Sequence, residues 1–384
     1  MTTMGLKDCC TIIAGQSPES KYYNTDGIGL PFFQGKADFG ELYPTIRVYC
    51  SQPTKIAEKD DILLSVRAPV GPTNLAPCQV CIGRGLTAIR PSSSLNLKYV
   101  LFFFRYFEAQ LQQKGTGTTF KAITQDVVKN LEIPVPPLDE QERIVARIEE
   151  LFSQLDSGVE TLRKTKQQLA VYRQAVLKEA FAKFTDYTTL ASISTRIFDG
   201  PFGTNLKTAD YVSAGIRVVR LENIKNGWFD DSKQSFVTEA KYETIKQHTV
   251  YPSDLIMSTF MADNIKICQL PAHIPFAVNK ADCIGIRLRD DYLPEFVILY
   301  LLQREVYQRV AVDIHGATRP RVNTKQIKAI PIPKAGLELQ NAIVSSVEEK
   351  LSLCDSIENT VDLSLQQVEA MRQSILKQAF ENNI

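Results

Sequence analysis

Histidine is scarce in this chain, and the familiar catalytic and nucleotide-binding signatures are missing. Three histidines occur among 384 residues, at positions 248, 273 and 315. The sequence has no H-E-x-x-H, no G-x-S-x-G and no phosphate-binding loop ending in Gly-Lys-Ser/Thr. The stretch "IGRGLTA" (82–88) lacks the third glycine of a dinucleotide-binding loop. These absences favour a binding or scaffolding role over catalysis.

Long apolar runs and patterned cysteines are missing as well. No apolar run approaches the roughly 18 residues needed to cross a bilayer, because Arg105 interrupts the most apolar stretch, "VLFFFRYF" (100–107). The segment "MTTMGLKDCC" has no basic stretch followed by an apolar one, so we expect a cytoplasmic protein without a membrane partner. The eight cysteines include a single close pair, Cys78 and Cys81, whereas zinc usually takes four ligands. We therefore expect reduced thiols and no metal site.

One segment of the sequence occurs twice. "YRQAVLKEAF" (172–181) and "MRQSILKQAF" (371–380) share six of ten residues. Without gaps, residues 138–181 align with 337–380 at 18 of 44 identical positions. The similarity extends upstream, where "LEIPVPP" (131–137) corresponds to "IPIPKAG" (330–336). Such similarity predicts an internal duplication.

Each copy of this segment predicts a long helix, since apolar residues recur every seven positions and prolines precede both segments. We expect Ile144, Leu151 and Tyr172, with Ile343, Ile357 and Met371, to complete the heptads. Two apolar stripes of this length would not remain exposed, so we expect the helices to pack on each other as an antiparallel coiled coil. The predicted helix-pair interface consists of Ile148, Leu155, Leu162, Leu169, Val176, Val347, Val361, Val368 and Ile375.

The remaining sequence predicts two globular α/β segments, so the fold class is α+β with a pseudo-twofold repeat. "DDILLSV" (60–66) resembles "SDLIMST" (253–259), and both predict strands. Residues 97–113 and 293–310 predict helices, and Phe102–Phe104 belong to the core. The predicted organisation is a globular domain at 1–137, a long helix at 138–185, a second globular domain at 186–336 and a second long helix at 337–384.

Charge follows the same division, although the net charge of the chain is only +1. Residues 1–137 contain 14 Lys and Arg against 11 Asp and Glu, and residues 186–336 contain 19 against 16. The globular segments are therefore the basic parts and the helices the acidic ones. A modest positive excess is compatible with phosphate contacts.

Together these features resemble the specificity subunit of type I restriction–modification systems. The most specific segments are the two related proline-rich starts, "IPVPPLDEQERIV" and "IPIPKAGLELQNAIV", and the "YRQAVLKEAF"/"MRQSILKQAF" endings. "DILLSVRAPVG" (61–71), "GPFGTNLK" (200–207) and "VVRLENI" (218–224) resemble recurring segments of that family. The second copy departs from the family pattern at Lys334–Gly336 and Leu339.

The resemblance implies a non-catalytic subunit with two target recognition domains, each reading one half of a split double-stranded DNA site. It implies that the helices fix the spacer and dock two methyltransferase subunits, which bind S-adenosylmethionine. Two restriction subunits, which use ATP and Mg²⁺, would complete the assembly. No cofactor is expected in this chain itself.

For the first domain, we predict DNA contacts from polar loops. Gln34 is a candidate for adenine and Lys36 for phosphate, while Arg67 either pairs with guanine or holds its own loop. The loop "KGTGTTFK" adds four further candidates, Lys114, Thr116, Thr118 and Lys121.

For the second domain, the predicted DNA contacts are Thr204, Asn205, Lys207, Arg220, Asn223, Asn264, Lys266, Arg319 and Arg321. Any single cation among these candidates could instead be a solvated surface group. "GPFGTN" could be a plain turn with a buried Phe202. Two other functions stay open: a coiled-coil adaptor with two protein-binding domains, and an enzyme with an unrecognised site.

Overall fold

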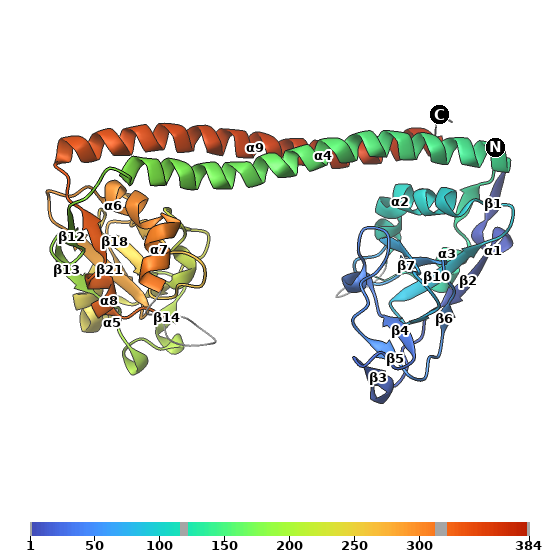
Figure 1. Ribbon diagram of the computed structural model, residues 1–384. Coiled ribbons are helices and arrows are strands. Elements are labelled where there is room, and N and C mark those ends of the chain that lie inside the picture. Colours follow the sequence, from blue (N-terminus) through green and yellow to red (C-terminus); the bar gives the residue numbers. More distant parts are fainter. Residues whose placement is uncertain (1, 116–121, 312–320, 382–384) are drawn as a thin grey trace. The chain divides into compact units, whose positions relative to one another are not determined.

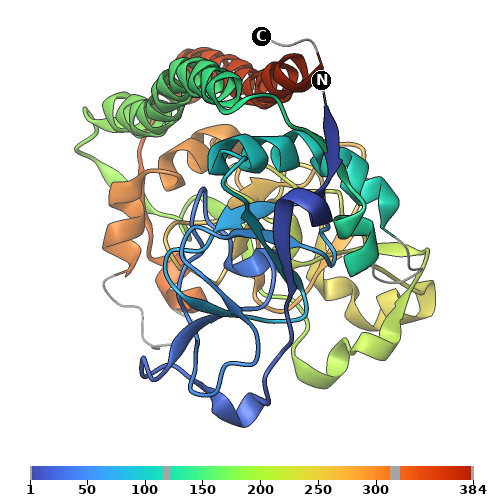
Figure 2. The ribbon, with the colours of Figure 1, turned by 90° about the vertical axis from the view of Figure 1, so that its right-hand side faces the viewer.

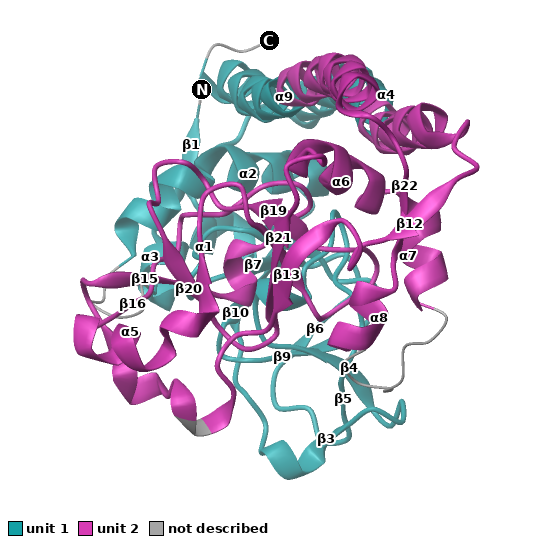
Figure 3. Cartoon of the chain, turned by 90° about the vertical axis from the view of Figure 1, so that its left-hand side faces the viewer, with its two compact units in different colours: residues 1–163, 362–384 teal, residues 164–361 magenta. Residues whose placement is uncertain are grey.

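The computed structural model describes residues 2–115, 122–311 and 321–381, and of Thr204 the backbone only. The chain divides into two compact units, coloured separately in Figure 3. Unit 1 consists of residues 1–163 and 362–384, and unit 2 of residues 164–361. The prediction assigned each long helix to a separate region. Instead, each long helix is divided between the two units.

Unit 1 begins with a mixed set of short strands and helices (Figure 1). In chain order they are β1 (Thr3–Gly5), α1 (Leu6–Cys9), β2 (Cys10–Ala14), β3 (Tyr23–Asn24), β4 (Leu30–Phe33), β5 (Tyr49–Cys50), β6 (Ile56–Ala57), β7 (Ile62–Ser65), β8 (Thr73–Leu75), β9 (Val80–Ile82), β10 (Leu86–Pro91), α2 (Leu97–Lys114), α3 (Gln125–Lys129) and β11 (Glu132–Pro134).

The strands in the described part of unit 1 form three sheets. One antiparallel sheet has the order β2-β10-β7-β8, and another sheet has the order β3-β5-β4-β9-β6. Within the second sheet β4 and β9 run parallel, with Phe33 opposite Ile82. Strand β1 pairs with β11 beside the start of the long helix α4 (Leu138–Phe181).

Unit 2 contains its own set of short elements. They are β12 (Tyr187–Thr189), β13 (Ser194–Phe198), β14 (Tyr211–Val212), β15 (Ile216–Val219), β16 (Phe236–Val237), α5 (Glu239–Ile245), β17 (Thr249–Val250), β18 (Leu255–Ser258), β19 (Ile267–Gln269), β20 (Ala277–Asn279), β21 (Cys283–Leu288), α6 (Pro294–Leu301), α7 (Arg304–Ala311), α8 (Thr324–Lys328) and β22 (Pro331–Pro333). The long helix α9 (Leu337–Glu381) follows.

The sheets of unit 2 have the same strand orders as those of unit 1. Its four-stranded sheet is β13-β21-β18-β19 and its five-stranded sheet is β14-β16-β15-β20-β17. Strands β15 and β20 form the parallel pair, and β12 pairs with β22. The predicted correspondence of 60–66 with 253–259 is thus confirmed, since β7 and β18 hold the same place in their sheets.

The helices that follow β10 and β21 differ between the units. In unit 1, α2 is continuous, and the Asn96 side chain caps it by accepting hydrogen bonds from the Lys98 and Tyr99 amides. In unit 2 the predicted helix at 293–310 is instead two helices, α6 and α7. Both α2 and α6 bury apolar faces against the long helices. In Figure 2 the ribbon of α2 lies next to the long helices. As predicted, Phe102–Phe104 belong to the core of unit 1.

The two long helices pack side by side within each unit. In unit 2, Lys166 of α4 pairs with Glu358 of α9 at 3.5 Å, Arg173 with Asp355 at 2.7 Å, and Glu179 with Lys350 at 3.9 Å. The partner number falls as the number along α4 rises, so these segments are antiparallel. In unit 1, Asp156 forms an ion pair with Arg372.

The buried face of these helices differs from the predicted heptad pattern. The nine predicted interface residues are all buried or half-buried, as are the side chains four positions after them, such as Phe152 and Leu351. In contrast, Tyr172, Ile357 and Met371 are 47%, 38% and 51% exposed, so their prediction as interface residues is wrong. Each helix contacts both its partner helix and a globular part, which turns the buried stripe away from a simple two-helix seam.

No helix in the part of the chain that the structure describes is both long and apolar enough to cross a membrane.

Candidate nucleic-acid interface

Unit 1 contains a cleft of 640 Å³ into which three of the predicted DNA contacts open. Gln34, Lys36 and Arg67 line this cleft. Ser17 and Arg84, which the sequence analysis did not select, line it as well. We call this cavity the unit 1 cleft. Its volume is sufficient to admit a planar group such as a nucleobase edge.

Strand topology explains why these residues meet. Gln34 follows β4 and Arg84 follows β9, and the two strands are parallel neighbours. Their carboxyl ends therefore meet at the same sheet edge. Arg67 follows β7 of the other sheet, where the hydroxyl of Ser65 donates hydrogen bonds to the carbonyls of Arg67 (3.1 Å) and Pro69 (2.9 Å). These bonds fix the loop that presents the Arg67 side chain.

The unit 1 cleft is electrostatically positive. Lys36, Arg67 and Arg84 are exposed, and within the described residues none of their side chains has an ion-pair or hydrogen-bond partner. One carboxylate, that of Asp38, lines the cleft. It accepts a hydrogen bond from the backbone N–H of Gln34 at 2.8 Å. The Gln34 side chain is exposed and remains available. The three unpaired cations and the side-chain amide of Gln34 form a surface suited to DNA, because the cations can contact phosphates and the amide can contact a base edge.

The other predictions for the first domain lie apart from this cleft. Lys114 is the exposed last residue of α2 and does not line the cleft. Thr116, Thr118 and Lys121 lie outside the described residues.

Equivalent positions in unit 2 follow from conserved backbone hydrogen bonds. Three backbone N–H to C=O hydrogen bonds of unit 1 each have a counterpart in unit 2. In unit 1 they run from Gly83 to Phe33, from Val66 to Gly85 and from Ile123 to Val66. Their counterparts in unit 2, in the same order, run from Lys280 to Val219, from Thr259 to Asp282 and from Val322 to Thr259. Counted along the strands from these bonds, Gln34 corresponds to Arg220 and Arg67 to Phe260. The edge of unit 2 defined by these positions is called the unit 2 edge below.

At the position in unit 2 that corresponds to Arg67, the guanidinium group comes from the residue on the other side of a β-bridge. Arg67 is bridged to Ala122 in unit 1, whereas Phe260 is bridged to Arg321 in unit 2. The guanidinium carbon of Arg321 lies 4.3 Å from the centroid of the Phe260 ring, and Nη2 lies 3.4 Å from the Asp282 carboxylate. The Arg321 side chain is still 53% exposed. It is therefore held in one orientation yet remains accessible.

Two further cations approach one tyrosine ring of unit 2. Arg220 lies 5.6 Å and Lys280 5.4 Å from the centroid of Tyr211. Arg220 also contacts Glu222 and the Ser235 hydroxyl, both at 3.3 Å. Lys280 was not selected from the sequence. The cations of unit 2 thus occupy other positions than those of unit 1, and two of them, Arg220 and Arg321, are partly neutralised by carboxylates.

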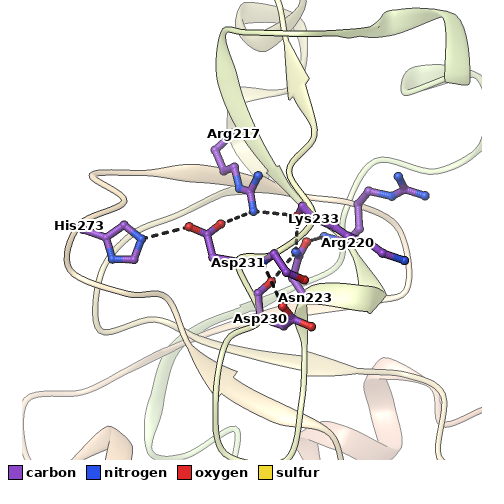
Figure 4. A network of polar contacts seen from close by, with 8 residues as sticks. Arg217, Arg220, Asn223, Asp230, Asp231, Lys233 and His273 are labelled. Carbon is purple, nitrogen blue, oxygen red and sulfur yellow. Dashed lines mark hydrogen bonds and ion pairs between the residues drawn. The ribbon is translucent and has the colours of Figure 1, made fainter. Parts of the chain in front are cut away.

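Asn223 does not face solvent, which corrects its prediction as a DNA contact. It is 1% exposed, and its side chain accepts from the Arg220 amide and donates to the carbonyls of Asp230 and Lys233, both at 2.8 Å. Figure 4 shows this amide at the centre of the loop network, with the Arg220 guanidinium extending away from it. Asn223 therefore positions the loop rather than reading a base.

A buried arginine completes the same network. Arg217 is 7% exposed and donates to Asp231 at 2.6 Å and to the Lys233 carbonyl at 3.1 Å. Burial lowers its pKa, which the Asp231 carboxylate opposes. The Asp231 carboxylate also lies 3.3 Å from His273 (Figure 4). These contacts fasten the loop that precedes β16 to the sheet.

The remaining predictions for unit 2 fall on two loops. Asn205 and Lys207 are exposed, while the side chain of Thr204 is outside the described part. Asn264 is half-buried, and Lys266 is exposed in the connection between β18 and β19. Arg319 lies outside the described residues.

One signal could have identified Arg84. It stands between Gly83 and Gly85 directly after a buried strand, and a Cβ atom on Gly85 would lie 2.2 Å from the Gln34 carbonyl oxygen. Glycines that permit such close backbone approach mark a tight, exposed loop. A cation at the tip of that loop is a candidate contact.

Comparisons with known proteins point to one family. Residues 1–170 match the family model described as type I restriction modification DNA specificity domain. This match covers less than half of the chain. The resemblance inferred from the sequence is confirmed. The match covers the first part of unit 1, residues 1–163, and continues for seven residues of α4 beyond the division between the units.

Relatives extend the similarity beyond the specificity domain. The putative type I restriction enzyme MjaX specificity subunit of Methanocaldococcus jannaschii is 41% identical over 167 residues, 43% of this chain and 38% of that protein. The type I restriction enzyme EcoKI specificity subunit of Escherichia coli is 21% identical over 91% of this chain and 80% of its own length. The crystal structure of the HsdS subunit from Thermoanaerobacter tengcongensis is 50% identical, with a TM-score of 0.37, over 40% of this chain and 37% of that one.

Proposed function

We propose that this chain recognises DNA sequence for a type I restriction–modification complex, and that each unit reads one half of a bipartite site. The observation that carries this proposal is the unit 1 cleft, where Lys36, Arg67 and Arg84 converge without side-chain partners among the described residues. Cations of this kind neutralise phosphates, while amide and guanidinium groups read base edges in the major groove. The match of residues 1–170 to a DNA specificity domain supports the same conclusion.

The two units are proposed to read different sequences. At equivalent positions unit 1 carries Gln34 and Arg67, and unit 2 carries Arg220 and Phe260. An amide pairs best with adenine and a guanidinium with guanine. A chain with the same strand orders but different side chains at these positions is suited to an asymmetric site.

We also propose that the chain is an internal duplication whose long helices form an antiparallel coiled coil. Support comes from the repeated strand orders and from ion pairs whose numbering runs in opposite directions. In this proposal the helices set the spacer between the half-sites and dock two methyltransferase subunits, and two restriction subunits join for cleavage. Exposed Tyr172, Ile357 and Met371 are apolar positions on which such subunits could pack.

Catalysis is assigned to the proposed partners rather than to this chain. The methyltransferase subunits would bind S-adenosylmethionine, and the restriction subunits would use ATP and Mg²⁺. Seven of the eight cysteines are buried, and within the described residues no group of three His, Cys, Asp or Glu side chains is placed to hold a metal ion.

The decisive experiment is co-expression with the adjacent methyltransferase, followed by genome-wide mapping of N6-methyladenine. We expect one bipartite motif with a fixed spacer, which disappears without this chain. The binding constant of the assembled complex should fall steeply with salt. An adaptor with protein-binding domains would instead give no motif and no sequence-specific footprint.

A further inference from the structure

Phe202 is an apolar side chain that the fold holds in solvent. It is 61% exposed, although the sequence left open a turn that buries it. It follows β13 in a loop whose geometry is fixed by Asp199. One carboxylate oxygen of Asp199 accepts hydrogen bonds from the amides of Gly200 (2.7 Å) and Asp282 (3.1 Å). Burial raises the pKa of this carboxyl group, although these hydrogen bonds lower it.

This loop is fastened directly to the unit 2 edge. A Cβ atom on Gly200 would lie 2.1 Å from the carbonyl carbon of Lys280, so only glycine permits this approach. The carboxylate of Asp282, whose amide holds Asp199, forms the ion pair with Arg321. Phe202 is therefore attached through short, specific contacts to the segment that carries the cations of unit 2.

The corresponding loop of unit 1 shows where such a residue lies. Gly15 packs against the Gly83 carbonyl as Gly200 packs against that of Lys280, since a Cβ atom on either glycine would lie 2.2 Å from the carbonyl oxygen. Two residues after Gly15 is Ser17, which lines the unit 1 cleft and accepts a hydrogen bond from the Arg84 amide at 3.3 Å. Two residues after Gly200 is Phe202. An aromatic ring in unit 2 thus takes the place of a cleft-lining hydroxyl in unit 1.

We propose that Phe202 packs its ring against a base of the half-site read by unit 2, a contact that unit 1 lacks because it has Ser17 there. The inference rests on the proposed DNA-recognition function and adds a specificity-determining residue to it. Cations near the ring would hold the phosphates while the ring meets a base face or a thymine methyl group. Apolar side chains that touch bases in this way gain burial only when DNA is bound.

The test begins with the wild-type complex, whose motif must be mapped first. With that motif established, Phe202→Ala should reduce affinity by about tenfold and relax base preference at one or two positions of a single half-site. Phe202→Leu should retain most of the affinity because it stays apolar. Tyr251→Ala is the matched control, since Tyr251 is an exposed aromatic residue at the opposite end of β18 and should leave the motif unchanged.

A direct contact can be detected by crosslinking. DNA carrying 5-iodouracil in the half-site of unit 2 should form an ultraviolet crosslink to the peptide containing Phe202. The inference is overturned if Phe202→Ala leaves both half-sites and the affinity unchanged, or weakens methylation at both half-sites equally without altering base preference. If the wild-type complex yields no bipartite motif, the proposed function fails before Phe202 is tested.

Discussion

Gln141 at the start of α4 and Gln340 at the start of α9 make the same three hydrogen bonds in their own units. Gln141 accepts from the Asn96 amide at 2.8 Å and donates to the carbonyls of Ser94 and Pro136 at 3.0 and 2.8 Å. Gln340 does the same with Leu293, Asp291 and Ala335, at 2.8, 2.9 and 2.8 Å. Both side chains are 0% exposed. Each glutamine therefore fastens the start of a long helix to the N-cap of an earlier helix of the same unit, α2 in unit 1 and α6 in unit 2.

Gln141→Leu and Gln340→Leu should each destabilise the fold strongly. The substitution removes the side-chain partner of one backbone amide and two carbonyl groups that are buried or partly buried, and a buried unsatisfied polar group costs about 1–3 kcal/mol. We expect the free energy of unfolding in urea to fall by at least about 2 kcal/mol in either variant. The exposed Gln168 of α4 provides the control, because Gln168→Leu removes none of these bonds. Equal stability of Gln141→Leu and Gln168→Leu would contradict the assigned role.

Arg67→Ala should alter recognition in one half-site only. Arg67 lines the unit 1 cleft without a side-chain partner in the described structure, so its removal leaves the fold intact. If it reads a base, discrimination at that position should fall by about 1–3 kcal/mol. Mapping N6-methyladenine in cells that carry this variant measures the change.

The contrasting result for Arg67 is also defined. Uniform weakening across sequences, with a salt slope reduced by about one, would make Arg67 a phosphate contact instead. Lys7→Ala is the control variant. Lys7 is an exposed cation on α1 outside the cleft, so its removal should leave the methylated motif unchanged.

The spacing of apolar residues in the sequence was sufficient to predict the two long, paired helices, because a helix with one buried face repeats its apolar residues locally. Residues at seven-residue spacing, such as Ile148 and Val347, are indeed buried. The sequence could not reveal which neighbouring positions complete the stripe, since that depends on the globular parts that the helices also contact. Tyr172 was misassigned for this reason.

The candidate site was less predictable because its members come from separate strands. Arg84 joins Gln34 through the parallel pairing of β4 and β9, which no local pattern records. Asn223 has a polar side chain in a promising loop, yet its amide bonds to carbonyls seven and ten residues onward. For Phe202 the sequence left open a turn that buries the side chain, but the side chain is 61% exposed, in a loop whose start Asp199 holds by hydrogen bonds.

Cys78 should be the first thiol to react with iodoacetamide at pH 8. Cys78 is partly exposed, whereas the other seven cysteines are buried. Burial raises the pKa of Cys81 to about 11 and that of Cys268 to about 12, so neither forms the reactive thiolate at this pH. Mass spectrometry of the native protein should show a single early adduct that is absent from Cys78→Ser. Early labelling of Cys81 would indicate that the sheet around β9 opens.

The proposed spacer role predicts the effect of lengthening both long helices by four residues. An insertion after Gly158 of α4 must be matched where α9 lies opposite. The ion pair between Asp156 and Arg372 places that point near Ala370. Ile357, which corresponds to Gly158 by the sequence repeat, would be the wrong choice because the helices are antiparallel.

Four helical residues add about 6 Å and a rotation of about 40°. One base pair adds about 3.4 Å, and a turn of about 10.5 base pairs gives roughly 35° for each. The length added by the insertions after Gly158 and Ala370 therefore equals the rise of between one and two base pairs. The added rotation equals the twist of about one base pair. We expect the methylated motif to keep both half-site sequences while its spacer lengthens by one or two base pairs. Altered half-sites with an unchanged spacer would refute the spacer role, whereas an insertion in one helix alone, which shifts the register between the two helices, should abolish methylation.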